Sequence, residues 1–167
     1  MGKVKIIVIA LVALIGITSN AYAEVALLQP DDFVGFTFLL VSIACLATTA
    51  FFFLEHSSVA PAWKTSIAVA GIVTGIAFIH SMYIRNIWVG TGDAPTVYRY
   101  IDWLITMPLL ASEFYLILST VRKVSSIIFW KLLIGTLVMV LGGYAGEAGY
   151  ISSFLGFVIW MVGWLYI

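Results

Sequence analysis

The sequence predicts an all-α protein that crosses a membrane several times. Hydrophobic residues make up 63% of the chain, charged residues only 10%, and the mean hydropathy is +1.13. A soluble domain is usually about half apolar and about a quarter charged. The net charge is zero, which suggests no nucleic-acid partner. The two histidines and the one cysteine, Cys45, form no cluster with the spacing of metal ligands, so we expect no metal site.

Residues 1–23 have the pattern of a signal peptide. Lys3 and Lys5 precede an apolar run over residues 6–17, and Ala21-Tyr22-Ala23 has the small-x-small form of a cleavage site. An apolar run of about 12 residues is too short to span a membrane. We therefore expect cleavage after residue 23 and a mature chain that begins outside the cytoplasm. The alternative is a first membrane anchor.

Five apolar segments follow the leader and form one transmembrane domain over residues 24–167. They run over residues 32–54, 65–89, 96–120, 125–148 and 151–167. The first four reach the roughly 20 residues that a spanning helix needs. The fifth is still apolar at Ile167, so we interpret it as a segment that the sequence interrupts.

The loops between the segments predict the orientation. An exported N-terminus places the first and third loops inside. Most basic residues then fall on inside loops and their edges: Lys64, Arg122, Lys123 and Lys131. The outside loops carry Arg85 alone. This distribution follows the positive-inside rule and favours the exported N-terminus.

The third segment holds the charged residues that point to function. Ionisable side chains at membrane depth are costly and indicate functional sites. Asp102 and Glu113 are 11 residues apart, which places them within about 20° on a helix and about 16 Å along its axis. Arg99 lies one turn before Asp102, and Thr106 lies one turn after it. A cation, a carboxylate, a hydroxyl and a second carboxylate on one side of a helix suit a directional proton path.

A purely structural role for these residues stays open. Arg99 and Asp102 could form an ion pair that only fixes helix packing, and Glu113 could bond a neighbouring helix. Pro108 removes one backbone hydrogen bond, which fits either a kink beside a ligand or an ordinary membrane-helix proline. His80 is either a packing residue or, from the neighbouring segment, a hydrogen-bond partner of Asp102.

The fourth segment ends in a glycine-rich stretch. Gly142 and Gly146 form a small-xxx-small pair, which lets helices approach closely. Glu147 follows near the outer end of the segment. We interpret Glu147 as an interfacial residue without a role in transport.

The third segment also resembles a known family. The run RYIDWLITMPLL over residues 99–110 resembles the third helix of microbial rhodopsins, and its extension over residues 113–118 resembles proteorhodopsins. Further similar stretches lie at residues 51–55, 63–66, 71–78, 92–97 and 146–149. The resemblance covers the chain from about residue 32 and extends to the leader. It implies a seven-helix bundle that binds all-trans retinal and pumps protons outward under light, as a transporter and not an enzyme.

The resemblance assigns a role to each candidate site residue. Asp102 matches the counter-ion and proton acceptor, Glu113 the cytoplasmic proton donor, and His80 the partner of the counter-ion. Arg99 matches the arginine on the extracellular side, and Thr106 completes the three-residue pattern of outward proton pumps. In the retinal pocket, Trp103 and Thr106 match wall residues, and Leu110 matches a colour-tuning position where leucine accompanies green absorption.

One part of the family pattern is missing. The family binds retinal through a lysine in its seventh helix, and the lysines of this sequence are Lys3, Lys5, Lys64, Lys123 and Lys131. None of them falls in the middle of a predicted spanning segment. We therefore interpret the chain as the N-terminal part of a pump, truncated within the fifth helix, which alone would neither hold retinal covalently nor transport protons.

The family resemblance also implies the setting of the protein. It predicts a multi-pass protein of the bacterial cytoplasmic membrane that forms a homo-oligomer when complete. Two alternatives to a pump remain: a sensory rhodopsin photoreceptor, against which the acidic Glu113 argues, and a membrane subunit without photoactivity whose buried charges serve assembly.

Overall fold

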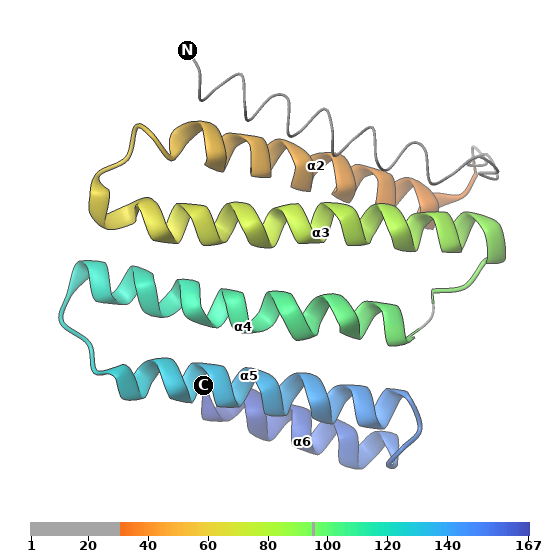
Figure 1. Ribbon diagram of the computed structural model, residues 1–167. Helices are drawn as coiled ribbons and strands as arrows, with labels where there is room; N and C mark the ends of the chain where they lie inside the picture. The colour runs from red at the N-terminus through yellow and green to blue at the C-terminus, as the bar shows by residue number, and fades with distance from the viewer. Residues whose placement is uncertain (1–30, 95) are drawn as a thin grey trace. The chain divides into compact units, whose positions relative to one another are not determined.

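The computed structural model describes residues 31–94 and 96–167, and the predicted signal peptide lies outside them. Helices are the only regular elements of this described part, which confirms the all-α class (Figure 1). The elements are α2 (Phe33–Glu55), the short 3-10 helix η1 (Pro61–Trp63), α3 (Lys64–Thr91), α4 (Thr96–Val121), α5 (Ser126–Glu147) and α6 (Ser153–Tyr166). Each α-helix begins and ends within two residues of the corresponding apolar segment.

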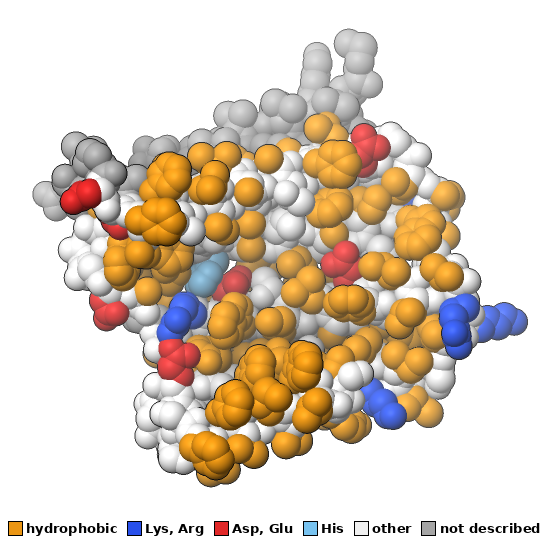
Figure 2. All heavy atoms as spheres, turned by 180° about the vertical axis from the view of Figure 1, so that it is seen from behind, with side chains coloured by type: hydrophobic (Ala, Val, Ile, Leu, Met, Phe, Trp, Pro, Cys, Tyr) orange, Lys and Arg blue, Asp and Glu red, His pale blue; other side chains and the backbone are white. Residues whose placement is uncertain are grey.

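Four of these helices are long and apolar enough to cross a membrane. The candidate spans are Phe33–Glu55, Pro61–Thr91, Thr96–Val121 and Ser126–Glu147. The fifth apolar helix, α6, has 14 residues. Large hydrophobic side chains are exposed on every α-helix of the described part, and Figure 2 shows hydrophobic side chains spread across the visible face. Exposed apolar helices of this length fit a hydrocarbon environment, where backbone polar groups must be paired within each helix.

The chain divides into two compact units, with the boundary between Asp93 and Ala94. The described part of the first unit is a pair of helices, α2 and α3, joined through η1. In the half of the pair nearer η1, the hydroxyl groups of Thr49 and Thr74 form a hydrogen bond of 2.9 Å. Gly71 leaves room for the ring of Phe53, because a Cβ at this position would lie 3.2 Å from that ring.

A polar contact joins the N-terminal end of α2 to the C-terminal end of α3 in the first unit. Asp32 caps α2 by accepting a hydrogen bond of 2.8 Å from the backbone N–H of Gly35. The same carboxylate accepts the indole N–H of Trp88, which lies 56 residues later in the last turn of α3. Helix α3 then ends at Gly92, whose φ of 72° is the left-handed conformation that favours glycine.

The second unit contains α4, α5 and α6. Helix α5 packs against both α4 and α6 (Figure 1). Two serines start the later helices: Ser125 accepts the N–H of Ile127, and Ser152 accepts the N–H of Leu155. Gly146 of α5 faces Gly156 of α6 so closely that a Cβ on Gly146 would lie 2.8 Å from the Gly156 Cα. The small-xxx-small prediction for α5 is therefore confirmed, and its partner is α6.

Candidate functional site

The candidate proton path lies along one unbroken helix. Helix α4 runs over 26 residues and contains Arg99, Asp102, Thr106 and Glu113 in that order. Helical geometry puts the two carboxylates about 16 Å apart along the axis and within about 20° of each other around it. The hydroxyl of Thr106, a buried residue, donates a hydrogen bond of 2.9 Å to the carbonyl oxygen of Asp102. Asp102 and Glu113 are both half-buried.

Pro108 lies between the two carboxylates without ending the helix. Ser112 Oγ donates to the carbonyl oxygen of Pro108 at 2.8 Å, one turn further along. Such back-bonding by serine is common within helices and can bend them. The proline therefore lies inside a continuous α4, midway along the candidate path.

The three predicted pocket residues lie beside the carboxylates. Trp103, Thr106 and Leu110 follow each other at helical spacing, so they form one flank of α4. The Trp103 ring meets the ring of Tyr100 edge-on, with centroids 5.1 Å apart. An indole ring, a hydroxyl and a branched alkyl group form an apolar wall with one polar atom, which is the usual lining of a pocket for a flat apolar ligand.

His80 and Asp102 belong to different units of the chain. His80 lies in α3 and is half-buried. The hydrogen bond predicted between His80 and Asp102 stays a prediction.

Arg99 forms an ion pair with Glu147, the last residue of α5. The same carboxylate accepts the hydroxyl of Thr96 at 3.2 Å and the phenol of Tyr100 at 3.0 Å. Three donors of α4 thus converge on one acid of α5. Arg99 and Glu147 are about equally exposed, at 40% and 39% of their side-chain surface.

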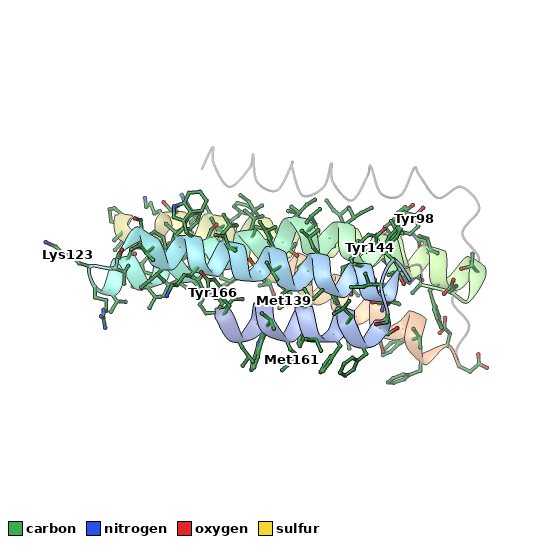
Figure 3. The ribbon with its side chains drawn as sticks, turned by 90° about the horizontal axis from the view of Figure 1, so that it is seen from below. Tyr98, Lys123, Met139, Tyr144, Met161 and Tyr166 are labelled. Carbon is green, nitrogen blue, oxygen red and sulfur yellow. The ribbon has the colours of Figure 1, made fainter. Side chains whose placement is uncertain are left out.

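A row of tyrosine rings begins at this ion pair with Tyr100, whose hydroxyl binds Glu147. The ring of Tyr144, one turn before Glu147, lies 5.3 Å from the ring of Tyr100 and 5.9 Å from that of Tyr150. Figure 3 shows Tyr98 and Tyr144 at one end of the second unit and Lys123 at the other end. The unit therefore has a pole with the Arg99–Glu147 pair and an opposite pole with basic side chains.

A groove of about 190 Å³ lies between α4 and α5. Its lining is apolar apart from two tyrosines: Val97, Tyr100, Ile101, Leu104, Val140, Leu141 and Tyr144. On the helical wheel the aliphatic α4 members lie about 100° to 160° away from Asp102. The groove is therefore on another side of α4 than the carboxylates, and we assign it no part in the proton path.

The Arg99–Glu147 pair was not predicted from the sequence. Glu147 was expected to be an interfacial residue, and Asp102 was the expected partner of Arg99. A usable signal was present, because Arg99 lies near the start of one segment and Glu147 at the end of the next. In antiparallel neighbours these positions have the same depth.

Comparison with known proteins shows the family. Residues 32–167 match the family of bacteriorhodopsin-like proteins. The chain is 52% identical over 139 residues to a green-light absorbing proteorhodopsin of Gamma-proteobacterium EBAC31A08, across 83% of this chain and 56% of that protein. It is 48% identical over 166 residues to a blue-light absorbing proteorhodopsin of Gamma-proteobacterium Hot 75m4, across 99% of this chain and 64% of that protein.

A solved structure gives the same result. The crystal structure of a blue light-absorbing proteorhodopsin from Med12 superposes with a TM-score of 0.73 at 51% identity, and the match covers 81% of this chain and 64% of that one. The chain thus spans less than two thirds of the length of these relatives. Its helices match part of a seven-helix bundle. On the family match and the fold together, this multi-pass membrane chain belongs to the bacteriorhodopsin-like protein family.

Proposed function

We propose that the chain is part of a retinal-binding, light-driven pump that moves protons outward. One observation carries this proposal: two carboxylates, Asp102 and Glu113, lie along one side of the continuous helix α4 with the hydroxyl of Thr106 between them. Membership of the bacteriorhodopsin-like family supports it.

Each residue of α4 has a distinct task in this proposal. Asp102 is the counter-ion that accepts the transported proton on the outer side, with His80 as its hydrogen-bond partner. Glu113 lies about 16 Å further along the helix and supplies the next proton from the cytoplasmic side. Thr106 anchors its hydroxyl on the Asp102 backbone and keeps a polar atom between the two acids. Two acids in different surroundings can hold opposite protonation states at one pH, which gives the transfer a direction.

The described residues fit one wall of a retinal site. Trp103, Thr106 and Leu110 would line it, and when bound the retinal supplies light absorption and the light-driven change that makes a proton available. The described part of the chain has three lysines, at the start of α3, in the α4–α5 connection and near the start of α5: Lys64, Lys123 and Lys131. None of the three lies mid-helix. We propose that the lysine that attaches retinal lies in the region of the relatives' sequences that this chain does not cover.

The setting of the pump follows from the loops. We propose a bacterial cytoplasmic membrane with the N-terminus outside and residues 1–23 as a cleaved leader. Glu113 then lies in the half of α4 nearer the basic pole with Lys123, and Asp102 in the half nearer the Arg99–Glu147 pair. We also propose that the complete protein is a homo-oligomer.

Light-driven acidification tests the proposed function. The test protein joins residues 1–167 to the C-terminal part of a proteorhodopsin relative and is expressed in cells supplied with retinal. We expect a visible absorption band and a light-dependent drop in external pH that a protonophore abolishes. A band without acidification would support a photosensor instead. A folded protein without any band would support a membrane subunit that lacks photoactivity.

A further inference from the structure

The guanidinium of Arg99 is held by α5, although its backbone lies on the side of α4 that carries Asp102. Arg99 precedes Asp102 by three residues, so their Cβ atoms are neighbours at about 5–6 Å on the helix surface. The terminal nitrogen Nη2 of Arg99 nevertheless binds the Glu147 carboxylate. Arg99 thus lies between two acids, one on its own helix and one on the next.

The Glu147 carboxylate is itself fixed in place. Its Oε1 atom accepts Thr96 at 3.2 Å as well as Arg99, and its Oε2 atom accepts Tyr100 at 3.0 Å. A carboxylate with donors on both oxygens is restricted in its rotation. Glu147 therefore acts as a fixed anion toward Arg99, unlike a flexible surface acid.

Only part of the donor capacity of Arg99 is used by this pair. Its Nε atom is buried and has no hydrogen-bond partner within residues 31–94 and 96–167. A guanidinium has five N–H donors in a rigid plane, so one edge can bind an acid while another stays available. The geometry lets Arg99 turn further toward α5 or back toward its own helix.

We propose that Glu147 is a positioning residue that holds Arg99 toward α5 and so limits how strongly the charge of Arg99 acts on Asp102. The inference rests on the proposed role of Asp102 as proton acceptor. A cation close to a carboxylate favours the charged form, which lowers its affinity for protons. An acceptor with too little proton affinity cannot take up the transported proton. Sharing Arg99 with Glu147 keeps the cation near Asp102 and weakens its effect.

The proposal can be tested without retinal, on the chain itself in lipid nanodiscs. The sequence has four aspartates, Asp31, Asp32, Asp93 and Asp102, so carbon-13 labelling of aspartate carboxyls gives four NMR signals. Comparison with Asp102→Asn identifies the Asp102 signal. Its titration midpoint between about pH 3 and pH 9 reports the proton affinity that Arg99 and Glu147 are expected to set.

Glu147→Gln should lower the Asp102 midpoint by about one pH unit, a tenfold loss of proton affinity, because Arg99 is no longer shared. In an Arg99→Gln background the same Glu147→Gln change should shift the Asp102 midpoint by less than about a third of that amount. Without Arg99, no cation remains through which Glu147 can influence Asp102. Tyr100→Phe keeps the ion pair and should produce a shift well below that of Glu147→Gln. Glu55→Gln removes an acid at the end of α2 and serves as the matched control without a shift.

Two results would overturn the proposal. The first is an unchanged Asp102 midpoint in Glu147→Gln. The second is an equal shift in the Arg99→Gln background, which would mean that Glu147 acts directly by its charge.

If Glu147→Gln does not fold, Glu147→Asp is titrated in both backgrounds, and a smaller downward shift that depends on Arg99 is required. The charged and phenolic groups at this end of α4 and α5 are Tyr98, Arg99, Tyr100, Tyr144 and Glu147, with Tyr150 after α5. His80, the proposed partner of Asp102, is unchanged in every variant. Failure of the pump assay with a positive titration would count against the proposed function alone.

Discussion

Trp88 Nε1 donates to both carboxylate oxygens of Asp32, at 3.0 and 3.1 Å, and so joins the last turn of α3 to the N-terminus of α2. The backbone N–H of Gly35 and the Trp88 indole, in that order, hold the pKa of Asp32 below its ordinary value of 3.8. Both donors favour the charged carboxylate. Asp32 therefore combines the cap of one helix with the clamp to the next.

The clamp predicts a pH-dependent stability. Because the pKa of Asp32 is lower in the folded state, its contribution is fully present above about pH 4 and is lost as the pH falls through the lowered value. Asp32→Asn should reduce the thermal midpoint at pH 6, and the difference from the unchanged chain should shrink toward pH 2.5. Circular dichroism in detergent measures both. A difference that persists at low pH would mean that the Asp32 charge does not carry the effect.

Trp88→Phe separates the clamp from the cap. Phenylalanine keeps an aromatic ring but removes the indole donor, while the Gly35 bond to Asp32 stays. We expect a lower thermal midpoint at pH 6, and a combined loss with Asp32→Asn that is smaller than the sum of the two single losses, because both changes weaken the same Asp32–Trp88 contact. Trp130→Phe changes an exposed tryptophan on α5 and serves as the control. Fully additive losses would contradict the clamp.

The close approach of α5 and α6 predicts a cost for any added side chain. A Cβ on Gly156 would lie 2.5 Å from the Cα of Gly146, a backbone atom that cannot turn away. Gly156→Ala should destabilise the chain by about 1–3 kcal/mol, the usual cost of overpacking. Gly90→Ala is the control, because nothing lies within 4 Å of a Cβ there. Unfolding by a denaturing detergent, followed by helical circular dichroism, measures both. Equal stability of the two variants would contradict the packing.

Glu113→Gln tests the donor end of the proton path. Gln cannot release a proton, so reprotonation from the cytoplasmic side should become about a hundredfold slower, within the range for loss of a positioned acid. The colour should change little, because Glu113 lies about 16 Å along α4 from Asp102. Flash spectroscopy of the joined protein measures both, and added azide, a small proton carrier, should restore the rate. Unchanged recovery would remove Glu113 from the path.

The sequence predicted the helices well because their signals are local. Apolar length defines α2 to α5, and single residues such as Ser125 and Gly92 mark helix ends. The closeness of α5 to a neighbour followed from Gly142 and Gly146, but the identity of that neighbour did not. A small-residue pair indicates that a helix packs closely and leaves open which helix it meets.

The contacts between distant residues were not predicted. Asp32 and Trp88 are 56 residues apart, and Arg99 and Glu147 are 48 apart. Each pair forms only if the two neighbouring helices are rotated about their axes so that the two side chains face each other. That rotation is set by packing along the full length of the helices. The positions of the residues within their segments place both Glu147 and Asp102 near the membrane depth of Arg99. The sequence therefore could not decide which of the two acids pairs with Arg99. The relative positions of the candidate proton-path residues could be predicted because all of them lie on one helix, α4.

The most direct measurement is light-driven proton export by the joined protein with Asp102→Asn. Asparagine keeps the size of the side chain but can neither act as a negative counter-ion nor accept a proton. We predict that external acidification disappears while a visible band remains and shifts to longer wavelength. Glu55→Gln should pump like the unchanged protein and confirms expression and retinal binding. Continued proton export by Asp102→Asn would contradict the account of the proton path.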